Sequence, residues 1–190
     1  MDIQPVTLEG NTVRLEPLTP QHAAELAEIA TPDLFVHHFP PPEFSENGFK
    51  MLIQFVSQYP DWCLFAIILK ETGKAIGVTA YLDIQPRNRT LEIGFTWIGK
   101  PYQGTKVNPE CKYLLLSHAF EDQEALRVQI KTDSRNLHSQ NAITKLGAVR
   151  EGVLRKQMIT LDGYVRDTVV YSIIDSEWGA VKEGLTARLQ

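Results

Sequence analysis

The stretch that decides the fold is LEIGFTWIGKPYQGTKVN, residues 91–108. Alternating apolar residues predict a strand over Thr90–Ile98, and the glycine-containing turn Gln103–Asn108 follows it. Asn108-Pro109-Glu110 supplies an N-cap residue, a proline suited to the first helical position and an acid that complements the helix dipole, so we predict a helix from Pro109 to about Asp122. A strand that runs into a tight turn and a helix N-terminus places free N–H groups where they can hold a phosphate.

Upstream of this stretch, the sequence predicts one strand, two helices and a hairpin of two strands. Apolar alternation indicates a strand at Thr12–Leu18, and Thr19-Pro20 is typical of a helix start. The other predicted elements are a helix at Ser45–Tyr59 and strands at Trp62–Leu69 and Ala75–Asp83, joined by the turn 71–74.

Downstream, the predicted elements are a strand at Leu126–Thr132, a helix from Asn136 to Leu146 ended by Gly147, and strands at about Ala148–Thr160 and Tyr164–Ile174. The segment Leu161-Asp162-Gly163 between the last two strands is a strong hairpin signal. No linker or repeat divides the chain, so we expect one domain over 1–190, with a core at about 10–175 and a C-terminal tail at 176–190.

Composition excludes several classes of function. The chain has 190 residues, a net charge of −4 and no basic stripe, which argues against a nucleic-acid partner. Cys63 and Cys111 share no metal-ligand spacing and are expected to be free thiols, so we predict no metal site. The longest apolar run, Cys63–Leu69, is too short to cross a bilayer, and the N-terminus has no signal-peptide pattern. We therefore expect a cytoplasmic protein without a membrane partner.

Two further segments carry a family resemblance. Thr132–Ser139 with Asn141–Ala148 resembles the second signature of the GNAT superfamily of N-acetyltransferases, in which a strand ends, an Asn caps a helix and the helix closes on Lys-Leu-Gly. Glu92-Ile93-Gly94-Phe95 and Arg150–Leu154 resemble the RimJ/RimL-type branch, which is related to the ribosomal-protein N-terminal acetyltransferases. The resemblance implies an α/β (α+β) GNAT fold: a mixed, mainly antiparallel sheet of about seven strands with helices on both faces.

The resemblance also implies acetyl-CoA, or another acyl-CoA, as co-substrate. The turn Gln103–Asn108 would hold its pyrophosphate, although Lys106 and Asn108 stand where the family usually has Gly and Gly or Ala. Asn136 would contact the pantetheine arm, Ser139 would lie against the coenzyme, and a backbone N–H near Phe95–Trp97 would bind the thioester oxygen. The expected coenzyme-binding residues are Phe95, Thr96, Trp97, Ile98, Gln103, Gly104, Thr105, Lys106, Val107, Asn108, Asn136 and Ser139.

For catalysis, the resemblance implies direct attack of an amine on the thioester. Glu92 is the expected base, with a solvent-facing strand residue as the alternative. Ser139 is the expected proton donor to the leaving thiolate, because Ile143 stands where many members have Tyr; the alternative is a solvent-facing serine. Met158 stands where the branch has a second carboxylate.

Several alternatives stay open at this stage. The acceptor could be a protein N-terminus or a small-molecule amine. The chain could also be a catalytically weak acyl-CoA sensor, or a transferase for a bulkier acyl group such as succinyl, which would need a cation near the acyl end. A homodimer could form through an exposed Trp178, which could equally well pack on its own sheet.

Among the remaining residues of interest, His37 and His38 could line the acceptor pocket. His22, His118 and His138 are expected on helix surfaces, and Cys111 could have a lowered pKa in the first turn of its helix.

Overall fold

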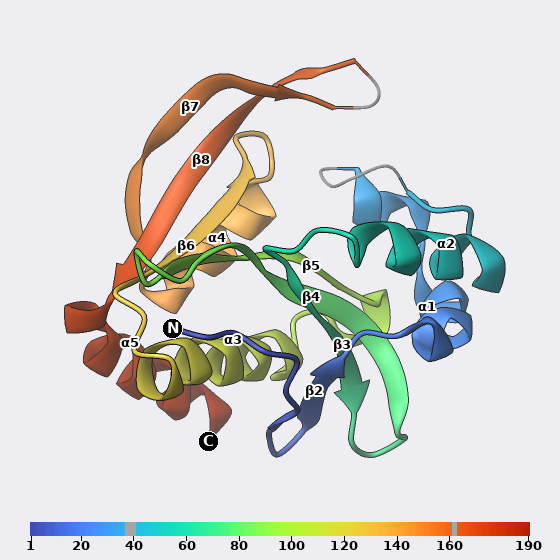
Figure 1. The fold of residues 1–190 in the computed structure, drawn as a ribbon, viewed down its shortest axis with the longest axis horizontal. Helices are drawn as coiled ribbons and strands as arrows, with labels where there is room; N and C mark the ends of the chain where they lie inside the picture. Colours follow the sequence, from blue (N-terminus) through green and yellow to red (C-terminus); the bar gives the residue numbers. More distant parts are fainter. Residues whose placement is uncertain (37–40, 161–162) are drawn as a thin grey trace.

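The computed structural model describes residues 1–36, 41–160 and 163–190 of the chain. Within them an eight-stranded sheet has the order β1-β2-β3-β4-β5-β6-β8-β7 (Figure 1). The strands are β1 (Leu8–Glu9), β2 (Val13–Pro17), β3 (Cys63–Leu69), β4 (Lys74–Gln85), β5 (Thr90–Ile98), β6 (Arg127–Asp133), β7 (Val149–Ile159) and β8 (Val165–Ile174).

The helices are α1 (Ala23–Ile29), α2 (Glu46–Val56), α3 (Val107–Ser117), α4 (Leu137–Leu146) and α5 (Asp175–Leu189). Short 3-10 turns lie at Pro20–His22, Pro32–Phe35 and Lys100–Tyr102, and a π-turn at His118–Asp122 continues α3. All strand pairs are antiparallel except β5–β6. The predicted fold class is confirmed, with the two-residue β1 as the strand beyond the expected seven.

The helices divide between the two faces of the sheet because the strand side chains alternate. Residues such as Phe65, Leu91 and Ile93 join the core under α3, α4 and α5. Ala66 and Trp97 point the other way and join Leu26 and Phe49 of α1 and α2. The prediction of helices on both faces is therefore correct.

The C-terminal segment is a helix rather than a tail. Trp178, Val181 and Leu185 of α5 are buried, and the Trp178 ring stacks on Phe120. The Trp178 indole N–H also donates to Glu121 at 2.7 Å. Of the two alternatives for Trp178, exposure is wrong and packing within its own chain is correct, because α5 buries it against the end of α3.

The start of α3 differs from the prediction, and part of the predicted β7–β8 hairpin lies outside the described residues. The helix after the turn begins at Val107, so Asn108 is inside its first turn and is not the N-cap. The residues Leu161 and Asp162 of the predicted hairpin turn lie outside the described part of the chain, as do His37, His38 and Phe39. Strands β7 and β8 nevertheless pair antiparallel, as a hairpin requires.

Candidate active site

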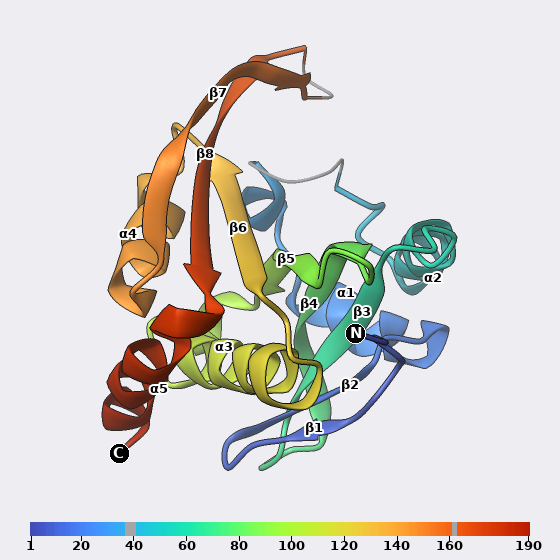
Figure 2. The ribbon, with the colours of Figure 1, turned by 60° about the vertical axis from the view of Figure 1, so that its left-hand side comes forward.

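The sheet opens at its centre. Strands β5 and β6 pair in parallel over only three residues, and the last pair is Glu92 with Gln129. Beyond that point β6 stays paired with β8 (Figure 2), while β5 stays paired with β4. The rest of β5 therefore has no strand on its β6 side among the described residues, and its backbone groups there are open to a ligand.

A bulge shapes this open part of β5. Gly94 pairs with Ala80 and Trp97 pairs with Val78, so Phe95 and Thr96 together face one residue of β4. Phe95 has a φ of 51°, which is unusual for a residue with a side chain. The bulge lies where the sequence predicted the oxygen-binding N–H. The Trp97 and Ile98 side chains are buried in the two cores, so only their backbone could contact a coenzyme.

The turn after β5 presents unpaired N–H groups. Gly104 takes the one left-handed conformation of the turn, with a φ of 72°. The Gln103 side chain donates to the Ile98 carbonyl at 2.9 Å, and the Thr105 hydroxyl donates to the Tyr102 carbonyl at 2.6 Å. These two bonds fix the loop. Within the described chain, no protein acceptor receives the backbone N–H groups of Gly104, Thr105, Lys106 and Asn108.

Lys106 does not strain the turn. Its φ of −69° and ψ of −11° are helical, so no glycine is needed at this position. The Lys106 ammonium donates to the Leu189 carbonyl at the end of α5, 2.8 Å away, rather than pointing into the turn. Lys106 therefore neither strains the turn nor places its ammonium inside it.

The start of α4 has the predicted cap. The Asn136 side-chain oxygen accepts the Ser139 backbone N–H at 3.0 Å, and Gly147 ends the helix in the left-handed conformation with a φ of 98°. The Asn136 amide NH₂ donates to no described residue, which leaves it available to a ligand. Ser139 is partly exposed, and within the described residues its hydroxyl has no hydrogen-bond partner. Contact of either residue with a coenzyme stays a prediction.

Glu92 lies on the face of β5 opposite Leu91 and Ile93. It is 9% exposed, so the alternative of a solvent-facing residue is wrong. Its carboxylate forms an ion pair with Lys131 of β6 at 2.8 Å. Gly94, two residues along, keeps the space beside the second carboxylate oxygen, since a Cβ there would lie 3.2 Å from it. The same Cβ would lie 2.6 Å from Leu82 Cδ1, so Gly94 leaves room for both the Leu82 and the Glu92 side chains.

A cationic side chain that the sequence did not single out lies near this pair. Arg166 of β8 is partly buried, and burial lowers its pKa while Asp133 and Glu92 raise it. The Arg166 Nε is buried without a hydrogen-bond partner in the described residues. Asp133 is already ion-paired with Arg135 at 2.8 Å, and Glu92 with Lys131. No sequence pattern marks Arg166, because only the β8–β6–β5 order brings it to Glu92.

A second missed group lies on the other face. Lys112 of α3 donates to the Thr96 hydroxyl in the β5 bulge at 3.0 Å. The Thr96 and Thr79 hydroxyls share a hydrogen bond of 2.8 Å. Burial lowers the pKa of Lys112 to about 8. A helical spacing that points Lys112 toward the sheet was the only signal available in the sequence.

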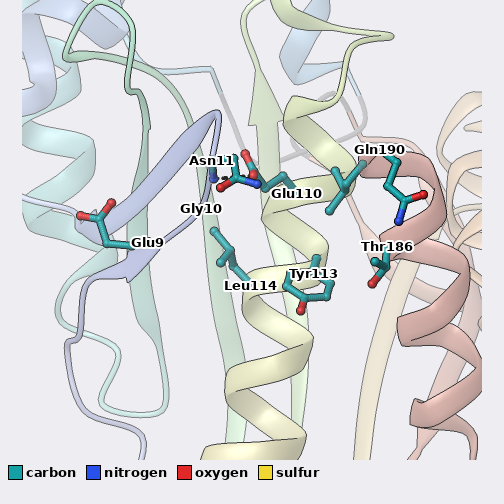
Figure 3. Close-up of a pocket in the computed structure, with 9 residues that line it drawn as sticks. Glu9, Gly10, Asn11, Glu110, Tyr113, Leu114, Thr186 and Gln190 are labelled. Carbon is teal, nitrogen blue, oxygen red and sulfur yellow. Dashed lines mark hydrogen bonds between the residues drawn. The ribbon is translucent and has the colours of Figure 1, made fainter.

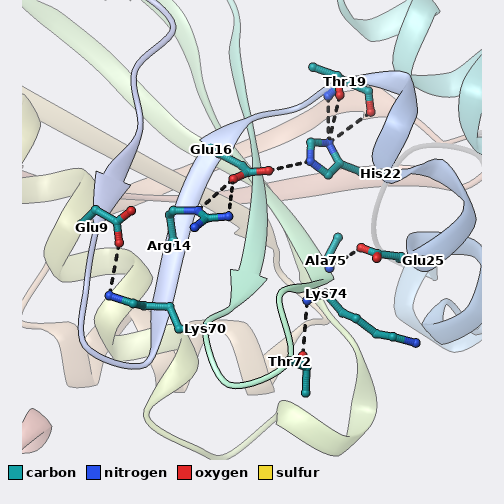
Figure 4. Close-up of polar contacts among 10 residues, drawn as sticks. All are labelled: Glu9, Arg14, Glu16, Thr19, His22, Glu25, Lys70, Thr72, Lys74 and Ala75. Carbon is teal, nitrogen blue, oxygen red and sulfur yellow. Dashed lines mark hydrogen bonds and ion pairs between the residues drawn. The ribbon is translucent and has the colours of Figure 1, made fainter.

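Several expectations about titratable residues are corrected. Burial raises the pKa of the Cys111 thiol to about 12, so this residue is not activated by its place near the helix start. His118 is buried under Tyr81 and contacts Asp122 at 2.8 Å. His22 contacts Glu16 at 2.9 Å and the Thr19 N–H at 3.1 Å, which ties the first helical turn to β2 (Figure 4). Only His138 is an exposed helix residue, as expected.

A pocket of about 270 Å³ lies away from these groups, between the β1–β2 turn, α3 and the end of α5 (Figure 3). Glu110 at its edge is 4% exposed. Its carboxylate accepts the backbone N–H groups of Asn11, Thr12 and Val13 at 2.7–2.8 Å. Glu110 therefore anchors the N-terminal strands to α3, and we assign the pocket no chemistry.

Metal ligands and membrane-spanning helices are the last features to consider. Among the described residues, no three His, Cys, Asp or Glu side chains are grouped as metal ligands. In the same part of the chain, each helix is too short or too polar to span a bilayer.

Comparison with known proteins agrees with this geometry. The family model described as an acetyltransferase (GNAT) domain matches residues 12–149. The ribosomal-protein-serine acetyltransferase of Escherichia coli strain K12 is 31% identical over 111 residues, which are 58% of this chain and 61% of that protein.

Two solved structures extend the likeness over nearly the whole chain. A GCN5-related N-acetyltransferase from Brucella melitensis has a TM-score of 0.93 and 30% identity, covering 99% of this chain and 87% of its own. Mycobacterium smegmatis RimJ in complex with CoA-disulfide has a TM-score of 0.80 at 19% identity, covering 96% and 94%, and shows the same fold. The chain belongs to the GNAT family of acetyltransferases, a family of transferase enzymes, and its relatives are of the RimJ/RimL type expected from the sequence.

Proposed function

We propose that the protein transfers an acetyl group from acetyl-CoA to a primary amine by direct attack. The observation that carries this proposal is the turn at Gly104–Asn108, whose four free N–H groups lie between the open edge of β5 and the start of α3. Such N–H groups, reinforced by the helix dipole, bind the two charged phosphates of a pyrophosphate. The open edge of β5 would then take the extended pantetheine arm.

The residues of this chain fit the remaining steps. The Asn136 amide would hold the arm, and a backbone N–H of the Phe95–Trp97 bulge would stabilise the charge that develops on the thioester oxygen. Glu92 would remove the proton from the attacking amine, directly or through a water. The Lys131 ammonium at 2.8 Å holds this carboxylate in place.

A protein N-terminus is the acceptor class that we propose first. The name of the Escherichia coli relative gives a ribosomal protein as its substrate. A small-molecule amine is the alternative, since nothing in the described side chains selects between the two.

A specific observation favours a second candidate activity, the transfer of an acyl group that carries a carboxylate, such as succinyl. Arg166 is a cation without a hydrogen-bond partner at its Nε, and the two neighbouring carboxylates already have closer cations. An acyl chain extending past Glu92 toward β8 would bring a terminal carboxylate to Arg166.

Calorimetry with acetyl-CoA, succinyl-CoA and free CoA tests both candidates. Acetyl-CoA should bind with micromolar affinity, and a thiol-release screen over peptides and small amines should then find the acceptor. Tighter binding of succinyl-CoA that is lost in Arg166→Met would favour the second candidate. Absence of binding by all three coenzymes would refute both.

A further inference from the structure

Lys112 is an anomaly that the proposed roles leave unexplained. Lys112 is partly exposed, and a lysine drawn even partly out of water usually has a carboxylate partner, because removing an ammonium from water is unfavourable. Within the described residues, no Asp or Glu lies at ion-pair distance from the Lys112 nitrogen, and its one hydrogen bond goes to the Thr96 hydroxyl. This ammonium therefore has two further N–H groups without an assigned acceptor.

The position of Lys112 relates it to the reaction. It lies on α3, five residues after Val107, where the helix leaves the proposed phosphate turn. Its hydrogen bond brings the ammonium to within 3.0 Å of the side chain of a bulge residue on the unpaired edge of β5. The backbone of this same bulge is the proposed binder of the thioester oxygen. The sulfur atom is bonded to the carbonyl carbon that carries this oxygen, so it would lie close to Lys112.

The other candidate proton donors to the coenzyme sulfur are poorly suited to this role. The position where many family members carry Tyr is Ile143, which is buried in the core under α4. The Cys111 thiol is fully buried, and burial raises its pKa to about 12. Ser139 is partly exposed at the start of α4, and a hydroxyl has too high a pKa to act alone as an acid near neutrality.

We propose that Lys112 is the proton donor to the coenzyme sulfur. As the amine nitrogen bonds to the carbonyl carbon, Glu92 takes a proton from that nitrogen. When the carbon–sulfur bond then breaks, the electron pair goes to sulfur and the sulfur takes a proton from the Lys112 ammonium. The products are the amide and neutral CoA thiol. Solvent then takes the proton from Glu92 and returns one to Lys112. This inference rests on the proposed acyl-CoA activity.

The electrostatic surroundings suit an acid that works near neutral pH. Burial lowers the pKa of Lys112 to about 8. The Cys111 thiol beside it, whose own pKa is raised to about 12, is uncharged in this range. An acid is active while protonated, so turnover should fall as the pH rises through about 8. Thr96, whose hydroxyl accepts from Lys112, does not titrate in this range, and neither does Thr79, which shares a hydrogen bond with Thr96.

The first test uses CoA alone and needs no acceptor. The pKa of the bound CoA thiol, followed by the ultraviolet absorbance of its thiolate, should lie below that of free CoA in the native protein. It should rise in Lys112→Met, which has a similar length and no charge, and stay low in Lys112→Arg. A bound thiol pKa that is the same in the native protein and Lys112→Met would overturn the proposal.

The second test separates the proton from the charge. With an acceptor from the amine screen, Lys112→Met and Lys112→Arg should both lose about 10²-fold or more in kcat, since arginine cannot donate a proton at neutral pH. The fall in turnover above about pH 8 should also vanish in both. Full activity in Lys112→Arg would show that only a positive charge is needed and would contradict the role of an acid.

The third test isolates a structural role. Thr96→Val removes the hydrogen bond to Lys112 but leaves its ammonium in place. This variant should lose less kcat than Lys112→Met and should keep the fall in turnover above about pH 8, because the lysine is held less firmly but can still donate its proton. A Thr96→Val protein that no longer shows this fall would contradict the proposal. A folded Lys112→Met protein that instead loses CoA binding would assign the lysine to coenzyme affinity and overturn the proposal. If native protein binds no acyl-CoA, it is the proposed function that fails.

Discussion

The charged side chains on the two faces of the sheet near β5 have different kinds of partner. On the face that α1 and α2 partly cover, Glu92 is balanced by a cation from the neighbouring strand. On the face under α3, Glu110 is held by three backbone N–H groups, and Lys112 by a single hydroxyl. We infer that the first face holds the carboxylate that takes a proton from the acceptor amine, while the second holds a carboxylate that anchors the fold and the lysine that gives a proton to the coenzyme sulfur.

The largest expected effect concerns the first face. Glu92→Gln keeps the shape of the side chain but removes the base, so kcat should fall by about 10²- to 10⁴-fold with little change in acetyl-CoA affinity. Steady-state kinetics and calorimetry check the two parts. Glu124→Gln, on an exposed carboxylate, is the control and should behave as the native protein. Unchanged kcat in Glu92→Gln would remove Glu92 as the base and break the comparison.

The next effect concerns the anchor on the second face. Glu110→Ala leaves three backbone N–H groups without an acceptor in a buried place, and should lower the free energy of unfolding by about 3 kcal/mol. Glu110→Gln, which can still accept hydrogen bonds, should lose less. Urea unfolding measures both, with the exposed Glu183→Ala as control. A loss below about 1 kcal/mol in Glu110→Ala would show that these bonds do not anchor β2 to α3.

Two substitutions at Asn136 distinguish its role as a helix cap from its proposed role in binding the coenzyme. Asn136→Asp keeps the capping oxygen but loses the NH₂ donor, whereas Asn136→Ala loses both. The alanine variant should lose about 1 kcal/mol of stability, and the aspartate variant should lose little. Both should bind acetyl-CoA about 5- to 10-fold more weakly, the equivalent of one hydrogen bond. Equal coenzyme affinity in all three proteins would leave Asn136 as a helix cap alone.

The smallest effect lies at the far edge of the sheet. Arg127 donates two hydrogen bonds to Glu151, and with a Ser172 bond they lower the pKa of Glu151 to about 2. The folded pKa lies below the ordinary value of about 4.3, so this stabilisation is complete above that value and is lost as the pH falls from about 4 to about 2.

The Glu151 side chain is 40% exposed, so solvent screening limits its effect to less than about 1 kcal/mol. The difference in unfolding free energy between the native protein and Glu151→Gln should therefore be small near neutral pH, shrink toward about pH 3 and shrink in high salt. A difference that grows in acid would contradict the assigned cause.

The sequence alone determined the order of the central elements and the local signals at their ends. Alternation along Thr90–Ile98, the cap at Asn136 and the stop at Gly147 depend on neighbours in the chain, which is why the structure agrees with them. The sequence did not predict helix α5, because that helix has no clear apolar stripe. The predicted start of α3 was two residues late, because proline and asparagine are accepted at several positions of a first turn.

Only the tertiary structure decided which distant residues meet. The ion pair of Glu92 with Lys131, the approach of Arg166 to both strands and the contact of Lys112 with the β5 bulge each join segments separated by many residues. No local pattern encodes these contacts, because they follow from the strand order β5-β6-β8 and from the face on which α3 packs. The sequence thus identified the turn that would hold the coenzyme and the carboxylate that would act as base, while the cations around them, Lys131, Arg166 and Lys112, appear only when the sheet is assembled.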